Sequence, residues 1–192
     1  MMPTKEDVRR ALEACAGYLE EKIRRFQERS VPRPVLAFLG YGRAGKDTAA
    51  EYLGQTTGRT YGGSTSNLFA PLVAAALGQD TETAFAERHS KREYWFRFGN
   101  LVREEDPTLL TKLLLSQADF VVGLRSLVEV EASRRDGLVD LAIWIENPRV
   151  PPDPTVEFSA SDCDITIVND RTIEAYRQKL DKLAKLLNLH GT

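Results

Sequence analysis

The sequence predicts an α/β domain built on a mostly parallel sheet that helices cover on both faces. Short apolar runs with the length of buried strands occur at residues 35–39, 120–123, 139–145 and 165–168. Stretches with helical spacing separate these runs. Strands that alternate with helices favour parallel pairing through right-handed crossovers. A chain of 192 residues is long enough for one such domain with a full core.

The first of these strands leads into a glycine-rich turn. Residues 40–46 read GYGRAGK and fit the pattern G-x-x-x-x-G-K, and the small and apolar residues that follow predict a helix. Strand, turn and helix together are the context of a phosphate-binding loop, or P-loop. Its backbone N–H groups and the positive end of the helix would converge on an anion. The expected phosphate contacts are those of Gly40, Gly42, Ala44, Gly45 and Lys46.

The two residues after the lysine are candidates for binding metal and phosphate. Asp47 stands where a hydroxyl group normally contacts Mg²⁺, and Thr48 follows it. Asp47 could hold Mg²⁺ directly or through water, or it could act as a base, and Thr48 could contact a phosphate. The alternative for the whole stretch is a glycine-rich turn that binds nothing.

Composition argues against several classes of function. A net charge of −2 gives no overall attraction to nucleic acid or membranes. The two cysteines and two histidines indicate neither a disulfide framework nor a structural zinc site. Because no apolar run reaches membrane-spanning length and no signal peptide is visible, we expect a cytoplasmic protein that does not bind membranes.

Residues 1–34 are expected to form an N-terminal helix and linker ahead of a domain at residues 35–192. Apolar residues at spacings of three and four predict one amphipathic helix over residues 4–29, with Thr4 and Asp7 as a capping box. This helix would pack on the domain or on a twin in a homodimer. The alternative is an arm that binds nucleic acid or another partner.

A polar loop at residues 62–67 is expected to separate a short strand at residues 59–61 from a helix at residues 68–77. Ser64 and Ser66 in this loop could cap the helix. They could equally belong to an acceptor loop whose hydroxyl groups contact a substrate. The sequence leaves both interpretations open.

Residues 82–103 are predicted to form a basic helix with interleaved aromatic residues. Arg88 and Arg92 would lie one helical turn apart and could hold one phosphate together. Trp95 and its aromatic neighbours could stack on a base, so that the surface would bind a nucleotide or a single strand. A charge-rich helix with an aromatic face toward the core is the alternative.

The next helix is predicted to start at Asp106, a capping residue followed by proline, and to run to about residue 117. Arg125 follows the carboxyl end of the strand at residues 120–123, where parallel sheets place their ligands. It is a candidate phosphate clamp that a salt bridge with Glu129 would hold. Alternatively, Arg125 is a surface residue that pairs within its own helix.

A proline-rich segment at residues 147–154 precedes the last strand and a final helix at residues 172–189. Such a segment is too rich in proline to form regular structure. In a phosphotransferase it would stand where a lid lies. We expect a loop with one useful cation, Arg149, instead of a separate lid domain.

Several of these stretches together resemble a known family. LGYGRAGKDTAAEYL is similar to the loop of bacteriophage-type deoxynucleoside monophosphate kinases, which also have G-K-D-T preceded by an arginine. NLFAPLVAAALG, FGNLVREEDPTLL, VVGLRSLVEVEASRRDG and DCDITIVNDRTIEAY resemble later motifs of that family in the same order. The resemblance covers roughly residue 35 to the C-terminus. It implies a P-loop core of the nucleoside monophosphate kinase type, the use of ATP and Mg²⁺, and the host cytoplasm if the protein is encoded by a phage.

The resemblance also implies roles for individual residues. Lys46 and Asp47 match the ATP loop, Arg125 matches the arginine of a D-x-R motif, and Asn169 matches a turn that lies near the adenine in such folds. The expected catalytic groups are Arg43, Lys46, Asp47 and Arg125. The expected substrate contacts are Ser64, Ser66, Arg88, Arg92, Trp95 and Arg149.

One departure from the family concerns the acceptor. Gly123 stands where D-x-R has its aspartate, and the sequence G-L-R-S resembles that of dephospho-coenzyme A kinase-like relatives. It is also similar to phage kinases that phosphorylate 5-hydroxymethyluracil within DNA. The main expectation is an ATP-dependent kinase of (deoxy)nucleoside monophosphates. The alternatives are a kinase of 5-hydroxymethyluracil in DNA and a non-catalytic nucleotide sensor.

Overall fold

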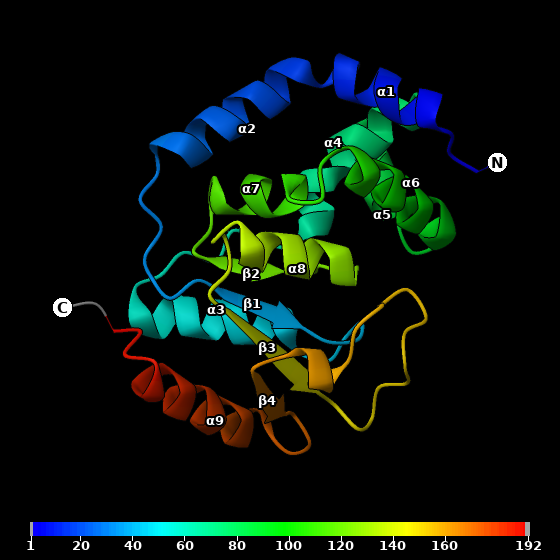
Figure 1. The fold of residues 1–192 in the computed structure, drawn as a ribbon. Helices are drawn as coiled ribbons and strands as arrows, with labels where there is room; N and C mark the ends of the chain where they lie inside the picture. Colours follow the sequence, from blue (N-terminus) through cyan, green and yellow to red (C-terminus); the bar gives the residue numbers. More distant parts are fainter. Residues whose placement is uncertain (1, 191–192) are drawn as a thin grey trace.

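The sheet has four strands, all of them parallel. The computed structural model describes residues 2–190. Its strands are β1 (Leu36–Leu39), β2 (Phe120–Val122), β3 (Leu141–Glu146) and β4 (Ile165–Val168). They lie in the order β2-β1-β3-β4, with Leu36 of β1 opposite both Phe120 and Leu141 (Figure 1). The α/β class and the parallel sheet predicted from the sequence are therefore confirmed.

Helices cover both faces of this sheet. Those on one face are α3 (Lys46–Thr57) and α9 (Ile173–Leu186), and those on the other are α7 (Leu109–Leu115) and α8 (Leu127–Arg135). Leu36 and Phe38 belong to the core with α3 and α9, whereas Ala37 and Leu39 belong to the core on the other face. This alternation follows from the pleat of a strand. All four residues are buried, as the central strand of a parallel sheet requires.

The N-terminal segment forms two helices, so the prediction of a single helix is wrong. The helices are α1 (Lys5–Ala14) and α2 (Ala16–Glu28), and the chain leaves helical geometry at Cys15, with φ −101° and ψ 13°. Because of this break, α1 packs on the helices of residues 65–105 while α2 packs on α7 (Figure 1). Thr4 and Asp7 form the predicted capping box. Packing of both helices on the domain itself therefore accounts for the apolar residues at spacings of three and four in this segment.

The basic segment at residues 82–103 is also divided, contrary to expectation. It contains α5 (Thr81–Ala86) and most of α6 (Arg92–Glu105), with a turn at residues 87–91 between them. The Arg88 guanidinium donates to the carbonyl of Phe85 at 2.9 Å and lies over the Phe85 ring. It thereby takes a carbonyl that a continuing helix would use. Arg88 and Arg92 are consequently not one helical turn apart.

The aromatic residues of α6 mostly face the core. Trp95 is 9% exposed and Phe98 is fully buried, and the Phe69 ring of α4 (Thr65–Leu77) packs against both. This helix therefore has an aromatic face toward the core, as the alternative interpretation expects, while Trp95 also lines a cavity.

Residues 59–61 form no strand, although they lie beside β2. The Asp119 N–H donates to the carbonyl of Thr60 at 2.8 Å, and the Asp119 carboxylate accepts from the Thr60 N–H at 2.7 Å. A side chain thus supplies one of the two bonds that a strand ladder would make with backbone groups alone. The predicted short strand is wrong for this reason.

Three helix boundaries differ from those expected. Asp106 ends α6, and its carboxylate accepts from the Thr108 N–H at 2.8 Å, so α7 starts at Leu109 and not at Asp106. Ser64 forms a capping box with Asn67, and α4 consequently starts three residues before the predicted residue 68. The final helix ends at Leu186, before the predicted residue 189.

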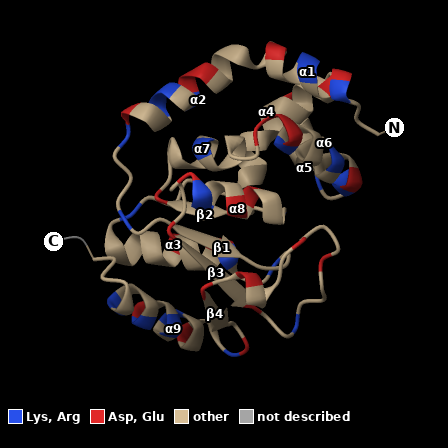
Figure 2. Cartoon of the chain, viewed as in Figure 1, with Lys and Arg blue, Asp and Glu red and all other residues tan. Residues whose placement is uncertain are grey.

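Positions of basic and acidic residues are interspersed along the outer helices α1, α2 and α9 (Figure 2). Arg9 pairs with Glu6 at 2.7 Å and Arg24 pairs with Glu21 at 2.6 Å, each within one helix. Over residues 5–28 the charges are therefore mixed and do not form the uniformly basic face that favours nucleic-acid binding. Within residues 2–190, no helix is long and apolar enough to cross a membrane.

Candidate functional site

The turn between β1 and α3 requires glycine at two positions. Gly40 has φ +138° and Gly45 has φ +109°. A Cβ atom at Gly40 would lie 2.6 Å from the carbonyl oxygen of Ile145, and one at Gly45 would lie 2.7 Å from Nδ2 of Asn169. Neither close approach leaves room for a side chain. The two glycines of the pattern therefore let the turn pack directly on β3 and on the loop after β4.

Two side chains from the C-terminal part of the chain hold this turn. Asn169 Nδ2 donates to the carbonyl of Ala44 at 2.9 Å, and the Tyr176 hydroxyl donates to the carbonyl of Gly45 at 3.0 Å. Asn169, expected near an adenine, supports the turn in this structure. Arg43 adopts φ +65°, a left-handed conformation that is uncommon for residues other than glycine, and its side chain is exposed.

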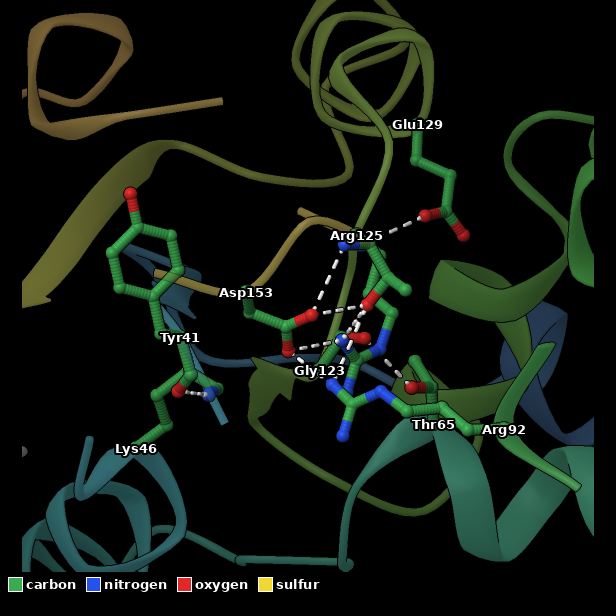
Figure 3. Close-up of polar contacts among 9 residues, drawn as sticks. Tyr41, Lys46, Thr65, Arg92, Gly123, Arg125, Glu129 and Asp153 are labelled. Carbon is green, nitrogen blue, oxygen red and sulfur yellow. Dashed lines mark hydrogen bonds and ion pairs between the residues drawn. The ribbon is translucent and has the colours of Figure 1, made fainter. Parts of the chain in front are cut away.

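Lys46 is a buried cation at the end of the turn. It is 9% exposed, and its Nζ donates to the carbonyl of Tyr41 at 2.6 Å (Figure 3). Burial lowers the pKa of Lys46 to about 8, and the positive charge of Arg125 acts in the same direction. An anion bound in the turn would oppose both effects, because an opposite charge favours the protonated amine. Binding an anion would therefore favour the charged form of Lys46.

Asp47 and Thr48 lie exposed in the first turn of α3. The Tyr61 hydroxyl donates to Asp47 Oδ1 at 2.6 Å. Mg²⁺ prefers oxygen ligands and usually binds one or two carboxylates together with phosphate oxygens and water. Residues 2–190 contain no group of three or more His, Cys, Asp or Glu side chains that could hold a metal ion by themselves. Asp47 lines the cavity described below and is one carboxylate of the kind that Mg²⁺ binds, whereas Thr48 lies outside that lining.

Arg125 is held by a different carboxylate from the one expected. Its Nη1 donates to Asp153 Oδ2 at 3.0 Å and to Thr155 Oγ1 at 2.7 Å (Figure 3). Glu129 instead accepts from the Arg125 backbone N–H at 3.2 Å and forms an ion pair with Arg103 at 2.9 Å. Because Glu129 belongs to the capping box of α8, its carboxylate turns toward the start of that helix. The predicted salt bridge between the Arg125 and Glu129 side chains is wrong.

Gly123, which the resemblance aligned with the aspartate of D-x-R, has a backbone geometry that favours glycine. It has φ +97°, and the Thr65 hydroxyl donates to its carbonyl at 2.9 Å (Figure 3). A Cβ at this position would lie 2.7 Å from Thr65 Oγ1. This backbone therefore does not accept an aspartate at position 123. The carboxylate that faces the glycine-rich turn comes from Asp153, in the proline-rich segment.

The turn opens onto a cavity of about 840 Å³. Cationic side chains from several separate segments line this phosphate-side cavity, namely Arg43, Lys46, Arg88, Arg92, Arg125 and Arg149. Gly42, Asp47, Ser64, Ser66, His89 and Asp153 also line it. Of the other predicted site residues, Gly40, Ala44, Gly45, Thr48 and Asn169 lie outside this lining, and Trp95 belongs to the neighbouring cavity described next.

A smaller cavity of about 110 Å³ adjoins the first. Both are lined by Arg88, Arg92 and Arg125, so these arginines stand where the two cavities meet. Phe69, Trp95, Phe96 and Leu110 form apolar walls of the smaller one, which we call the aromatic cavity. The structure thus places Trp95 and the arginines around one continuous region.

Arg149, predicted as a substrate cation, has protein partners. Its Nη2 lies within 3.3 Å of the carbonyl of Asn169 and 3.4 Å of that of Arg171. These contacts join the proline-rich segment to the loop after β4. Residues 147–154 form the expected irregular loop.

Sequence reasoning missed Asp153 and His89 as members of the site. His89 lines both cavities, and the charge of Arg88 lowers its pKa. Asp153 is 8% exposed and lies between two arginines. The segment that carries Asp153 follows the carboxyl end of β3, and this position alone could have marked it as a site residue.

No protein-family model, curated protein or solved structure matches the chain. The class that its fold and site define is an α/β protein with a four-stranded parallel sheet and a cation-lined cavity at the carboxyl ends of its strands.

Proposed function

We propose that the protein is a phosphotransferase with a P-loop core that uses ATP and Mg²⁺, and that its acceptor is a (deoxy)nucleoside monophosphate. One observation carries this proposal. Buried Lys46 ends a turn that requires glycine, and Arg92 and Arg125 line the same cavity from other segments. Phosphoryl transfer depends mainly on positive charge that is fixed in place before the reaction, and this arrangement supplies such charge.

The donor side would work as follows. The N–H groups of the turn and the Lys46 amine would hold the β- and γ-phosphates of ATP. Asp47 and Thr48 would hold Mg²⁺, which neutralises charge on the phosphate oxygens. Arg43 and Arg125 would offset the charge that develops on the transferred phosphoryl group.

The aromatic cavity is an argument for a small acceptor molecule. Arg88 and Arg92 at its mouth could bind the acceptor phosphate, and the apolar walls could enclose a base. Trp95 is buried in a wall of this cavity and is not part of an exposed row of aromatic residues. This arrangement favours a single nucleotide over a track for single-stranded DNA.

A transfer assay tests the proposal. Labelled ATP and Mg²⁺ would be incubated with the protein and either free deoxynucleoside monophosphates or DNA that contains 5-hydroxymethyluracil. We expect label on a nucleotide, loss of transfer in Lys46→Ala, and full transfer in Lys182→Ala, which changes an exposed lysine on α9. Label on DNA alone would replace the nucleotide acceptor with DNA. No transfer to any acceptor, despite ATP binding, would indicate a nucleotide sensor.

A second variant separates the two acceptors by their chemistry. The phosphate of a nucleotide is already ionised, whereas a hydroxymethyl group must lose a proton and Asp47 would be its base. If Asp47 contacts Mg²⁺ only through water, the amide oxygen of asparagine can keep that contact, and Asp47→Asn should retain much of the transfer to a nucleotide. Near-complete loss of transfer in this variant would point to a hydroxyl acceptor.

A further inference from the structure

The Asp153 carboxylate is fully engaged by neighbouring groups. Oδ2 accepts from Arg92 and, at 3.0 Å, from Arg125. Oδ1 accepts from the Thr155 backbone N–H at 3.0 Å and from the Thr155 hydroxyl at 2.6 Å. Figure 3 shows the carboxylate facing the side chains of both arginines, with Lys46 toward the glycine-rich turn. Two guanidinium groups from separate helices and loops therefore converge on one anionic group of the protein itself.

This anion lies directly against the glycine-rich turn. A Cβ atom at Gly42 would be 3.5 Å from Asp153 Oδ2 and 3.8 Å from Nη2 of Arg92. The carboxylate is also close enough to Lys46 to favour its charged form. Asp153 thus occupies the part of the phosphate-side cavity where the turn and the arginines meet.

We propose that Asp153 stands in for a phosphoryl group in the unliganded protein, and that a phosphate-bearing ligand displaces it from Arg92 and Arg125. This inference rests on the proposed function, because it takes the cavity to be a phosphate site. Arginine binds carboxylates and phosphates through the same charge-assisted hydrogen bonds, so one anion can replace the other. The displaced carboxylate would carry the proline-rich segment away from the turn.

The protonation state of Asp153 agrees with this role. Burial alone would raise its pKa, but hydrogen bonds from Thr155 and the Arg125 guanidinium outweigh burial and hold the pKa well below its usual range. The side chain therefore stays ionised and is a poor proton acceptor. It is suited to competing with an anionic ligand and unsuited to acting as a catalytic base.

The segment on either side of Asp153 has the features of a loop that can move. Residues 147–154 have no regular secondary structure, and Pro151 and Pro152 are exposed. On one side of Asp153 the segment is held through Arg149 at distances of 3.3 to 3.4 Å, and on the other the Glu157 N–H donates to the Arg125 carbonyl at 2.9 Å. Release of the Asp153 carboxylate, together with the bond from Arg125 to the Thr155 hydroxyl at 2.7 Å, would free the residues between these two attachments.

Calorimetric titration of the full chain with inorganic tripolyphosphate, and separately with ATP, both with Mg²⁺, tests the proposal. Asp153→Asn keeps the shape of the side chain and removes its charge. We expect it to bind tripolyphosphate about tenfold more tightly than the unmodified protein, which corresponds to one competing charge-assisted hydrogen bond. Asp136→Asn, which changes an exposed carboxylate at the end of α8, is the matched control and should leave the affinity unchanged.

Limited proteolysis gives a second readout that needs no ligand. Trypsin can cleave after Arg149, and release of Asp153 should speed this cleavage in Asp153→Asn but not in Asp136→Asn. If Asp153→Asn fails to fold, Thr155→Val removes the hydroxyl bond to the carboxylate together with the bond that this hydroxyl accepts from Arg125 at 2.7 Å. Both losses weaken the hold on Asp153 and Arg125, so the tripolyphosphate affinity should rise about twofold to fivefold.

The outcomes separate this inference from the proposed function. Equal or weaker binding by Asp153→Asn, with clear binding by the unmodified protein, would refute the displacement and show that Asp153 only positions the two arginines. Cleavage after Arg149 at an unchanged rate would also refute it. If neither protein binds tripolyphosphate or ATP, the phosphate site itself is refuted, and the proposed function fails with it.

Discussion

The pKa of Lys46 leads to a quantitative prediction for ligand binding. With a pKa of about 8, Lys46 is mostly charged at pH 7, and only about a tenth of the free protein carries the charge at pH 9. A triphosphate needs the charged form, so the affinity for ATP should be about tenfold weaker at pH 9 than at pH 7. Binding near pH 8 should also take up about half a proton per molecule of ligand.

Isothermal titration calorimetry in buffers with different ionisation enthalpies measures both quantities. Lys46→Met is the control, because it should bind weakly and with little dependence on pH over this range. An affinity that is flat from pH 7 to pH 9 in the unmodified protein would refute the reasoning. An equally steep fall in Lys46→Met would do the same, because the titrating group would then lie elsewhere.

The same pKa has a consequence for stability. Between pH 8 and the ordinary lysine value of 10.5, the unfolded chain binds more protons at Lys46 than the folded one does. The contribution of this residue to the free energy of unfolding should therefore rise with pH in that window, by about 3 kcal/mol at most. Comparing the unmodified protein with Lys46→Met by urea unfolding at pH 7.5 and pH 9.5 isolates this contribution. A difference between the two proteins that stays constant with pH would contradict it.

Three further predictions concern the residues that shape the site, each measured by chemical denaturation. Gly123→Ala should lower the free energy of unfolding by about 1 to 3 kcal/mol, because φ is +97° and the new Cβ would lie 2.7 Å from a threonine hydroxyl; an unchanged value would show that the backbone relaxes freely. Glu129→Ala should lower the free energy of unfolding by about 3 to 5 kcal/mol, because it leaves the 9% exposed side chain of Arg103 without its carboxylate partner. Restored stability in a double variant with Arg103→Met would confirm the cause. Tyr176→Phe should lower the free energy of unfolding by about 0.5 to 1.5 kcal/mol, because it removes the hydrogen bond from the hydroxyl to the turn. A larger decrease would mean that the ring has moved.

The parts of the fold that could be predicted are those fixed by neighbouring residues in the sequence. The apolar runs predicted all four strands, and β1, β2 and most of β3 are buried on both faces, which makes such runs easy to recognise. Gly40 and Gly45 predicted a turn that depends on glycine, since their positive φ values exclude most other residues. The capping box of Thr4 and Asp7 could be predicted for the same reason, because its two residues lie close together in the sequence.

The features that could not be predicted depend on partners distant in the sequence. The break at Cys15 lets α1 and α2 pack on different helices of the domain. Nothing in the helical pattern of the sequence indicates this break. Glu129 could reach either Arg125 or Arg103, and only the folded structure decides between them. Asp153 joins the site because a loop of irregular structure folds back over the turn, which no periodic pattern describes.

The arc formed by α1 and α2 restricts which parts of the protein can move. Tyr18 donates to the carbonyl of Leu68 in α4 at 2.9 Å, and Arg29 pairs with Asp119 at the start of β2 at 2.6 Å. Through these two contacts, α2 joins the helical layer around Trp95 to the edge of the sheet. Opening of the proposed site by rotation of that layer would have to break these attachments, so displacement of the loop over the cavity would cost less free energy.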